Sequence, residues 1–309
     1  MALTIDTRQF AGQAAARLLG RLAFQMNATM KSPDPEAVHD LRVAIRRFSQ
    51  SLVVFKPCFP GKEKRKVRQR LKRLMVQAGE VRNCDVALKL LAKSRSQETA
   101  ALLPRIRGRR KEAERVLTGA LKRRIERKSS LKWRTILETA LASAGGKFNQ
   151  TPIEDNARSM LPRMAKEFLA LGHAVAGTKV PPEKLHQFRI ASKKFRYSLE
   201  LCAPLYGVNL KRWIERMKRV QNLLGDINDC STLLEMIPEQ KETRATRAWL
   251  KRRERRKIED FRRWWQESYA TPEVTRSWMR DLRNPPSAAI KKPAVRAETS
   301  HARAAAAGS

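Results

Sequence analysis

The chain contains one basic motif twice, and the residue types of this motif suit the binding of an anion. The first copy, VHDLRVAIRRF, begins at Val38, and the second copy, LHQFRIASKKF, begins 147 residues later at Leu185. Two of the four histidines of the chain, His39 and His186, occupy the same place in the two copies. Histidine, arginine and lysine are the side chains that carry or acquire positive charge, so a repeated arrangement of them predicts a site for negative charge.

Each copy of the motif has the periodicity of an amphipathic helix. At about 100° per residue, His39, Arg42 and Arg46 share a stripe roughly 60° wide, and the apolar Leu41 and Ile45 lie on the opposite face. The basic stripe of the second copy contains His186, Arg189, Lys193 and Arg196. A single basic stripe is usually only a solvated face. Because a solvated face does not need its charges in fixed places, the repetition favours an anion site over this ordinary alternative.

The composition strongly favours a partner of high negative charge. The 309 residues include 66 Lys and Arg against 30 Asp and Glu, which gives a net charge of +36. A positive charge of this size destabilises a compact chain through self-repulsion, and it attracts polyanions. Nucleic acid, polyphosphate, an anionic membrane surface and heparin-like polymers all remain candidates on composition alone.

The sequence predicts an all-α fold, because almost everything before residue 283 has helical periodicity and no convincing strand is present. Several local signals predict helix boundaries. Gly79 and Gly225 are typical C-terminal caps, Asn83 and Asp229 are typical N-terminal caps of the helices that follow, and Pro104 is expected to interrupt a long charged helix.

Three pairs of segments indicate an internal duplication. The basic motifs match at an offset of 147 residues, whereas Lys72–Gly79 matches Lys218–Gly225 and Arg109–Lys111 matches Arg255–Lys257 at an offset of 146. Two copies are too few for a solenoid, so we expect two related helical bundles that face each other. The expected parts are a first half at 1–148, a second half at 149–284, and a disordered tail at 285–309 that is rich in Ala, Pro, Ser and Lys.

The paired motifs resemble the CHAD domain, the conserved histidine α-helical domain. The resemblance rests on the His-x-x-Arg-x-x-x-(Arg/Lys) pattern and on the later segments Gly79–Asn83 and Gly225–Asp229, and it covers about residues 7–282. One departure is visible. The first of these segments usually ends Arg-Asp in the family but ends Arg82-Asn83 here, which leaves Asp85 as the nearby carboxylate.

The resemblance implies two four-helix-bundle-like halves around a basic cavity that binds inorganic polyphosphate. Family members are often found with polyphosphate granules or fused to a triphosphate-processing domain. The ten candidate ligand-binding residues are His39, Arg42, Arg46, Lys72, Arg82, His186, Arg189, Lys193, Arg196 and Lys218. Two of them, Lys72 and Lys218, could instead pair with helix C-termini near the glycines. Bound phosphate would raise the pKa of both histidines, so tighter binding is expected below about pH 6.5.

Two other kinds of binding remain as alternatives. Nonspecific RNA or DNA binding could use the basic stretches 62–73, 105–128 and 244–263, although only 6% of residues are aromatic and no stacking motif is present. Weak nucleic-acid binding is expected of such a basic chain in either case. A metal site at His39 and His186 is the more remote alternative, since each histidine has an arginine one turn away that would repel a cation.

The sequence predicts a non-catalytic cytoplasmic protein without a cofactor. No P-loop, GxGxxG, HExxH or Ser/His/Asp arrangement is present, and carboxylates that could hold catalytic metal ions are scarce on both stripes. The four cysteines have no metal-ligand spacing, and neither a signal peptide nor a membrane-spanning run is found. The resemblance adds an association with polyphosphate granules. The oligomeric state is left open.

Overall fold

The computed structural model describes residues 5–94, 97–177 and 180–284. Within these residues the chain forms eleven α-helices and two short 3-10 helices, and the only β-type pairing is an isolated bridge between Asp6 and Pro152. The predicted all-α fold is therefore confirmed. The predicted tail at 285–309 lies outside the described residues.

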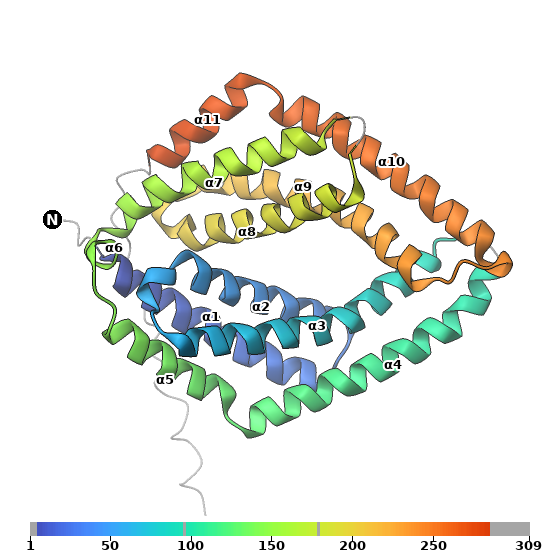
Figure 1. Cartoon of the computed structure of the whole chain (residues 1–309), viewed down its shortest axis with the longest axis horizontal. Helices are drawn as coiled ribbons and strands as arrows, with labels where there is room; N and C mark the ends of the chain where they lie inside the picture. The colour runs from blue at the N-terminus through green and yellow to red at the C-terminus, as the bar shows by residue number, and fades with distance from the viewer. Residues whose placement is uncertain (1–4, 95–96, 178–179, 285–309) are drawn as a thin grey trace, which may run out of the picture.

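The helices fall into two successive groups (Figure 1). The first group is α1 (Thr7–Lys31), α2 (Pro35–Val54), η1 (Lys56–Cys58), α3 (Lys62–Leu91), α4 (Gln97–Glu126) and α5 (Ser129–Ala142). After the short α6 (Lys147–Gln150), the second group is α7 (Ile153–Val175), α8 (Pro182–Tyr206), α9 (Val208–Met236), η2 (Lys241–Thr243), α10 (Arg244–Tyr269) and α11 (Pro272–Arg283). The helices α7 to α10 begin 146 or 147 residues after α1 to α4, which is the spacing that the sequence motifs predict.

The first two helices begin at aspartate caps. A side-chain oxygen of Asp6 accepts a hydrogen bond from the backbone N–H of Gln9 at 2.6 Å. Asp34 accepts from the N–H groups of Glu36 and Ala37, both at 2.9 Å, and Pro35 occupies the first turn of α2. These bonds satisfy backbone donors that have no partner inside the helix, so the start of the first basic motif helix is fixed locally.

The predicted helix ends at the two glycines are wrong. Gly79 lies inside α3 and Gly225 inside α9, so Asn83 and Asp229 are interior helical residues rather than caps. A glycine inside a helix costs only about 1 kcal/mol relative to alanine. The fully buried Cys84 and its apolar neighbours lie beyond Gly79, and packing of that segment outweighs this cost.

Pro104 also does not end its helix, because α4 continues through it. The proline ring removes one backbone hydrogen bond, a cost of about 3 kcal/mol in a helix interior. Leu102 and Ile106, on either side of Pro104, are both buried in an apolar cluster. Burial of these neighbours holds the segment in the helical conformation.

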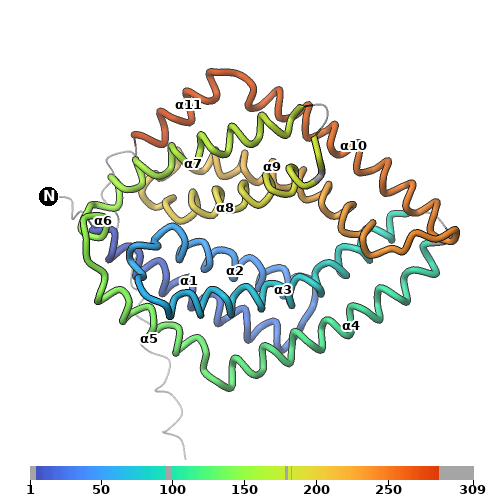
Figure 2. The backbone as a smooth tube through the Cα atoms, in the orientation of Figure 1, coloured from blue at the N-terminus to red at the C-terminus, as the bar shows by residue number. Residues whose placement is uncertain are grey.

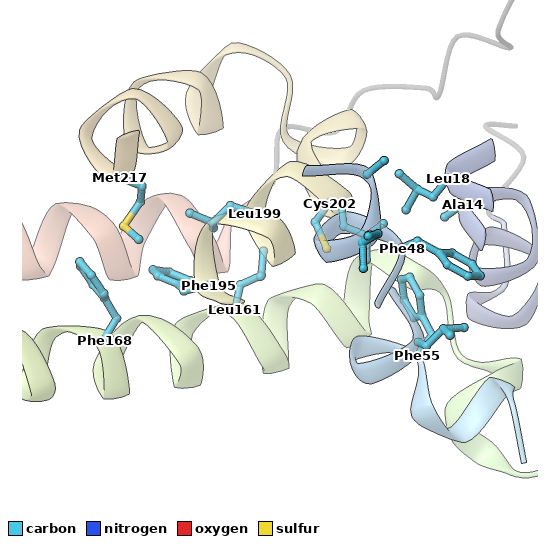
Figure 3. Close-up of a cluster of buried hydrophobic side chains, with 14 of the residues drawn as sticks. Ala14, Leu18, Phe48, Phe55, Leu161, Phe168, Phe195, Leu199, Cys202 and Met217 are labelled. Carbon is cyan, nitrogen blue, oxygen red and sulfur yellow. The ribbon is translucent and has the colours of Figure 1, made fainter. Parts of the chain in front are cut away.

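The two groups of helices form two halves that meet along α2 and α8 in the middle of the molecule (Figures 1 and 2). One apolar core runs through both halves, with Phe48 and Phe55 from the first half and Phe168 and Phe195 from the second (Figure 3). At the middle junction, the Gln50 side-chain amide donates to the Ser198 hydroxyl at 3.0 Å, and both side chains are buried.

A second apolar cluster joins the halves near the ends of α3 and α9 that lie far from α6 (Figure 1). We call it the distal cluster. Its buried members are Cys84, Ala87, Leu90, Leu91, Leu102, Ile106, Cys230, Leu233, Ile237 and Leu250. The sequence predicts similar core positions for Cys84 and Cys230, and both are fully buried here. The halves are therefore held at two separate junctions, and the segments of α2, α3, α8 and α9 next to these junctions carry the predicted basic residues.

No helix of the described residues is long and apolar enough to cross a membrane.

Candidate anion-binding site

Three helices from both halves bring six of the predicted basic residues together. We call this group the central cation cluster. Its members are His39, Arg42 and Arg46 on α2, Arg82 on α3, and Arg189 and Lys193 on α8. The side chains influence one another electrostatically across the two halves, since Arg46, Arg189 and Arg82 all act on Arg42, and Arg189, Arg46 and Arg42 all act on Lys193. All six are partly buried.

The cations of this cluster have no acidic partner in direct contact within the described residues. Arg42 donates only to the backbone carbonyl of Met75 at 3.3 Å, and Arg46 donates to the hydroxyl of Tyr197 at 2.8 Å. The Nε of Arg189 is buried and without a hydrogen-bond partner. Cations removed from water and left unpaired are costly, so this arrangement is stabilised when an anion enters.

Arg110, another partly buried arginine, has an acidic partner, unlike the arginines of the central cation cluster. Arg110 on α4 donates to Asp85 at 2.7 Å and also to the backbone carbonyl of Pro33 at 2.8 Å. Asp85, the carboxylate that the sequence offers in place of an aspartate at position 83, is thus engaged with α4 instead of the cation cluster. The fold pairs a partly buried arginine where its role is structural and leaves those of the cluster unpaired.

Burial and mutual repulsion lower the pKa values of the clustered cations. Burial is the largest cause at Lys193, followed by the charges of Arg189, Arg46 and Arg42, and together they lower its pKa to about 6. Burial likewise lowers the pKa of Arg42 to about 10. Most Lys193 side chains are therefore neutral at neutral pH in the ligand-free protein, and an anion would favour their protonation.

His39 is affected in the same direction. Burial lowers its pKa, and the charges of Arg82 and Arg46 lower it further. The contribution of His39 to tighter binding is therefore expected at a lower pH than the 6.5 predicted from the sequence. In the free protein His39 gains its proton only at lower pH, and the pH range over which affinity changes is set by Lys193 as well.

The cations of the cluster act electrostatically on one carboxylate, that of Asp229 on α9. Burial raises its pKa, and the positive charges of Arg189 and Arg82 act in the opposite direction. Sequence reasoning assigned Asp229 to a helix cap and so missed it. The signal was the repeat offset, which places residue 229 at the position of Asn83, directly after a cation of the cluster.

The other four predicted residues lie outside the cluster. Arg196 donates to Glu200 at 2.9 Å, and its guanidinium lies 4.8 Å from the ring centre of Tyr197. Lys218 is exposed and pairs with Glu215 at 2.6 Å. Lys72 is also exposed. Since α3 and α9 continue well past both lysines, neither lysine pairs with a helix C-terminus.

His186 differs from its counterpart His39. It is exposed, and its Nδ1 lies 3.3 Å from the side-chain oxygen of Asn228. The residue equivalent to Asn228 in the first half is Arg82, whose charge acts on His39. The described residues contain no group of three His, Cys, Asp or Glu side chains that could hold a metal ion.

Tyr197 and Gly79 position arginines of the cluster, a role that the sequence did not indicate for either residue. Tyr197 is buried, accepts the hydrogen bond from Arg46 and offers its ring face to that guanidinium at 5.8 Å. A Cβ atom at Gly79 would lie 2.8 Å from Nη1 of Arg42. The missing side chain of Gly79 therefore lets Arg42 cross the surface of α3 and reach the cluster.

The substitution Gly79→Ala should weaken anion binding by roughly tenfold without destabilising the fold. The new methyl group displaces only the flexible end of Arg42, while alanine favours the helix by about 1 kcal/mol. The matched control is Gly225→Ala at the equivalent place in α9, where the added methyl group meets no atom within 4 Å. Thermal melts and polyphosphate titrations of both variants check this. An equal effect of the two substitutions on affinity would contradict the role of Gly79.

The chain is an all-helical protein with a group of partly buried cations that come from α2, α3 and α8. The profile of the CHAD domain family matches residues 13–238, and the chain belongs to this family, whose known role is the binding of inorganic polyphosphate.

Two solved structures are similar to the chain. The crystal structure of the CHAD domain from the plant Ricinus communis has a TM-score of 0.67 at 18% sequence identity, over 91% of this chain and 94% of that one. PptA from Streptomyces chartreusis has a TM-score of 0.58 at 16% identity, over 86% of this chain and 100% of that one. At these identities the likeness concerns the fold. No curated protein matches the chain.

Proposed function

We propose that this protein binds inorganic polyphosphate without catalysis, and that the central cation cluster is the binding site. The observation that carries the proposal is the set of partly buried cations from both halves, which act electrostatically on one another and have no acidic partner in direct contact within the described residues. Membership of the CHAD domain family supports the same ligand. Association with polyphosphate granules would follow from this binding.

The chemistry of the cluster matches that of the polymer. Polyphosphate carries about one negative charge per phosphate unit and has no bases to stack or to read. Arginine offers a planar fork that engages two phosphate oxygens, and lysine acts as a point charge. Arg42, Arg46, Arg82 and Arg189 supply four such forks, and Lys193 supplies a point charge.

Nucleic-acid binding is the second candidate function, and the net charge of +36 is the observation that favours it. The exposed cations of α10, among them Arg252, Arg255 and Arg256, could follow a phosphodiester backbone. Such contacts are individually weak and screened by salt. They would compete poorly with a site whose cations are already shielded from water.

Polyphosphate binding should be accompanied by proton uptake and should weaken as the pH rises. The pKa of Lys193 is about 6 in the free protein, and a bound polyanion moves it towards its ordinary value of 10.5, so the complex holds more protons across this interval. His39 contributes in the same direction at lower pH. Calorimetric titration at about pH 6, 7 and 8.5, in buffers of different ionisation enthalpy, measures both effects.

The stability of the ligand-free protein should increase with pH, whereas the affinity for polyphosphate should decrease. An unfolded chain protonates Lys193 with the ordinary pKa of 10.5, so between pH 6 and 10.5 the unfolded state holds more protons at this residue, and its contribution to stability rises with pH. Absence of detectable polyphosphate binding would refute the proposed function. Binding without proton uptake would place the polymer elsewhere on the basic surface.

A further inference from the structure

A carboxylate is an unexpected component of a site for a polyanion. Asp229 is partly buried on α9, and the cations that act on it are Arg189 and Lys193 of α8 and Arg82 of α3. Another carboxylate, Asp226, acts on it from its own helix. Within the described residues Asp229 forms no ion pair or side-chain hydrogen bond of its own. It is therefore not the fixed partner of any one cation.

The two halves of the chain differ at this place. The residue of α3 equivalent to Asp229 is Asn83, which is neutral and follows Arg82 just as Asp229 follows Asn228. Asn228 lies within hydrogen-bonding distance of His186, at 3.3 Å. The helix thus accommodates an amide at this position in the first half, while the second half has a carboxylate beside the same cations. The part of the site contributed by the second half therefore contains a carboxylate, whereas the part contributed by the first half contains a neutral amide.

An ionised carboxylate and a fully ionised phosphate both have only hydrogen-bond acceptors. Placed together they repel each other unless one proton lies between them. An interior unit of polyphosphate has no hydroxyl that titrates near neutral pH. A terminal phosphoryl group has one, since the second ionisation of a phosphate monoester has a pKa of about 6. Only the end of the chain can bring this proton to the site at neutral pH.

We propose that Asp229 accepts a hydrogen bond from the hydroxyl of a terminal phosphoryl group, so that the central cation cluster takes the end of a polyphosphate chain in preference to its interior. This proposal rests on the proposed function. The proton stays on the phosphoryl oxygen, and no bond is broken. Arg82, Arg189 and Lys193, whose charges act on Asp229, hold the ionised oxygens of the same group.

A site for interior units and a site for the terminal group depend differently on the length of the polymer. A site for interior units would bind a long chain at many places, and its apparent affinity would increase with chain length. A site for the terminal group has at most two places on each chain, so affinity expressed per chain end does not depend on length. Asp229 would then determine specificity, whereas the neighbouring cations supply most of the attraction.

The test compares polyphosphate with free ends and polyphosphate of the same mean length whose two ends are blocked as morpholidates, which have neither a hydroxyl that titrates near neutral pH nor an N–H group. Wild type, Asp229→Asn and the control Asp260→Asn are titrated with both polymers at neutral pH. Asp260 loses the same charge but lies on α10, where it is 3.5 Å from Lys257. The folded state of each variant is checked by circular dichroism, and the asparagine already present at position 83 makes Asp229→Asn a conservative change.

Wild type and Asp260→Asn should bind the free-ended polymer at least about tenfold more tightly than the blocked one, as expected for one hydrogen bond to a charged group. Asp229→Asn should bind both polymers within about twofold, because its amide donates to any ionised phosphate oxygen. Equal binding of both polymers by wild type would overturn the inference and leave the proposed function standing. If neither polymer bound to wild type, the proposed function would fail as well.

Discussion

The substitution Lys193→Met is expected to stabilise the ligand-free protein and at the same time weaken polyphosphate binding. Burial and three neighbouring arginines lower the pKa of Lys193 to about 6, so the fold opposes the charge that this side chain carries in water. Methionine is also long and unbranched but needs no proton and no hydration. We expect a gain of about 2 kcal/mol, which raises the melting temperature by about 4 °C for a chain of this size.

The same substitution removes a side chain whose positive charge the bound polyanion favours. Without it, affinity should fall about ten- to hundredfold, and most of the proton uptake should disappear. The control is Lys194→Met, which changes an exposed neighbour and should alter neither property by much. If Lys193→Met destabilised the protein and left binding intact, Lys193 would be a structural residue and the electrostatic argument would be wrong.

A second large effect is expected from removing four members of the cluster together. The variant replaces Arg42, Arg46, Arg189 and Lys193 with alanine, which takes cations from both halves. Each contact of a cation with phosphate contributes about 1.5 to 3 kcal/mol, so polyphosphate affinity should fall by at least about a thousandfold. Because these cations are unpaired in the free protein, the variant should fold with little loss of stability.

The matched control removes the same number of positive charges from exposed positions. The substituted residues are Arg127, Lys132, Arg134 and Lys147, which lie in or beside α5 and α6. At about 0.15 M salt, screening limits their influence on the site, and affinity should stay within about threefold of wild type. Similar losses in both variants, measured by equilibrium titration, would mean that net charge alone attracts the polymer.

The sequence was sufficient to predict the helical fold and to indicate the six basic residues that the structure brings together. The repeat offset of 146 or 147 residues recurs in the starting residues of α1 to α4 and α7 to α10. Helical spacing also placed Arg42 and Arg46 on one face of α2. These features depend on near neighbours in the chain, which is why local patterns indicate them.

Features that depend on distant contacts were not predictable in this way. Gly79 has the local signature of a helix end, yet α3 continues through it, and its missing side chain makes space for Arg42 of another helix. Arg196 shares the stripe of Arg189, but Glu200 one turn later and the ring of Tyr197 hold it away from the cluster. Periodicity identifies a face of a helix and does not identify the element that covers it.

The residues that the sequence missed have the same explanation. Tyr197 belongs to α8 but orients Arg46 on α2, a contact between residues 151 positions apart. Asp229 looked like a cap because its surroundings on α3 and α8 are remote in sequence. Its pairing with Asn83 across the repeat was the available signal, and it indicates a difference between the halves rather than a function.

The most direct test of polyphosphate binding is a competition titration. Polyphosphate labelled at one end and bound to the protein is challenged with single-stranded RNA and with duplex DNA at matched charge, in about 0.15 M salt and again at higher salt. We predict that polyphosphate stays bound against a large charge excess of both nucleic acids, and that it does so in the control variant with the four exposed substitutions but not in the cluster variant. Displacement in proportion to charge alone, with binding that collapses steeply as salt increases, would contradict a shaped phosphate site and would favour nonspecific nucleic-acid binding.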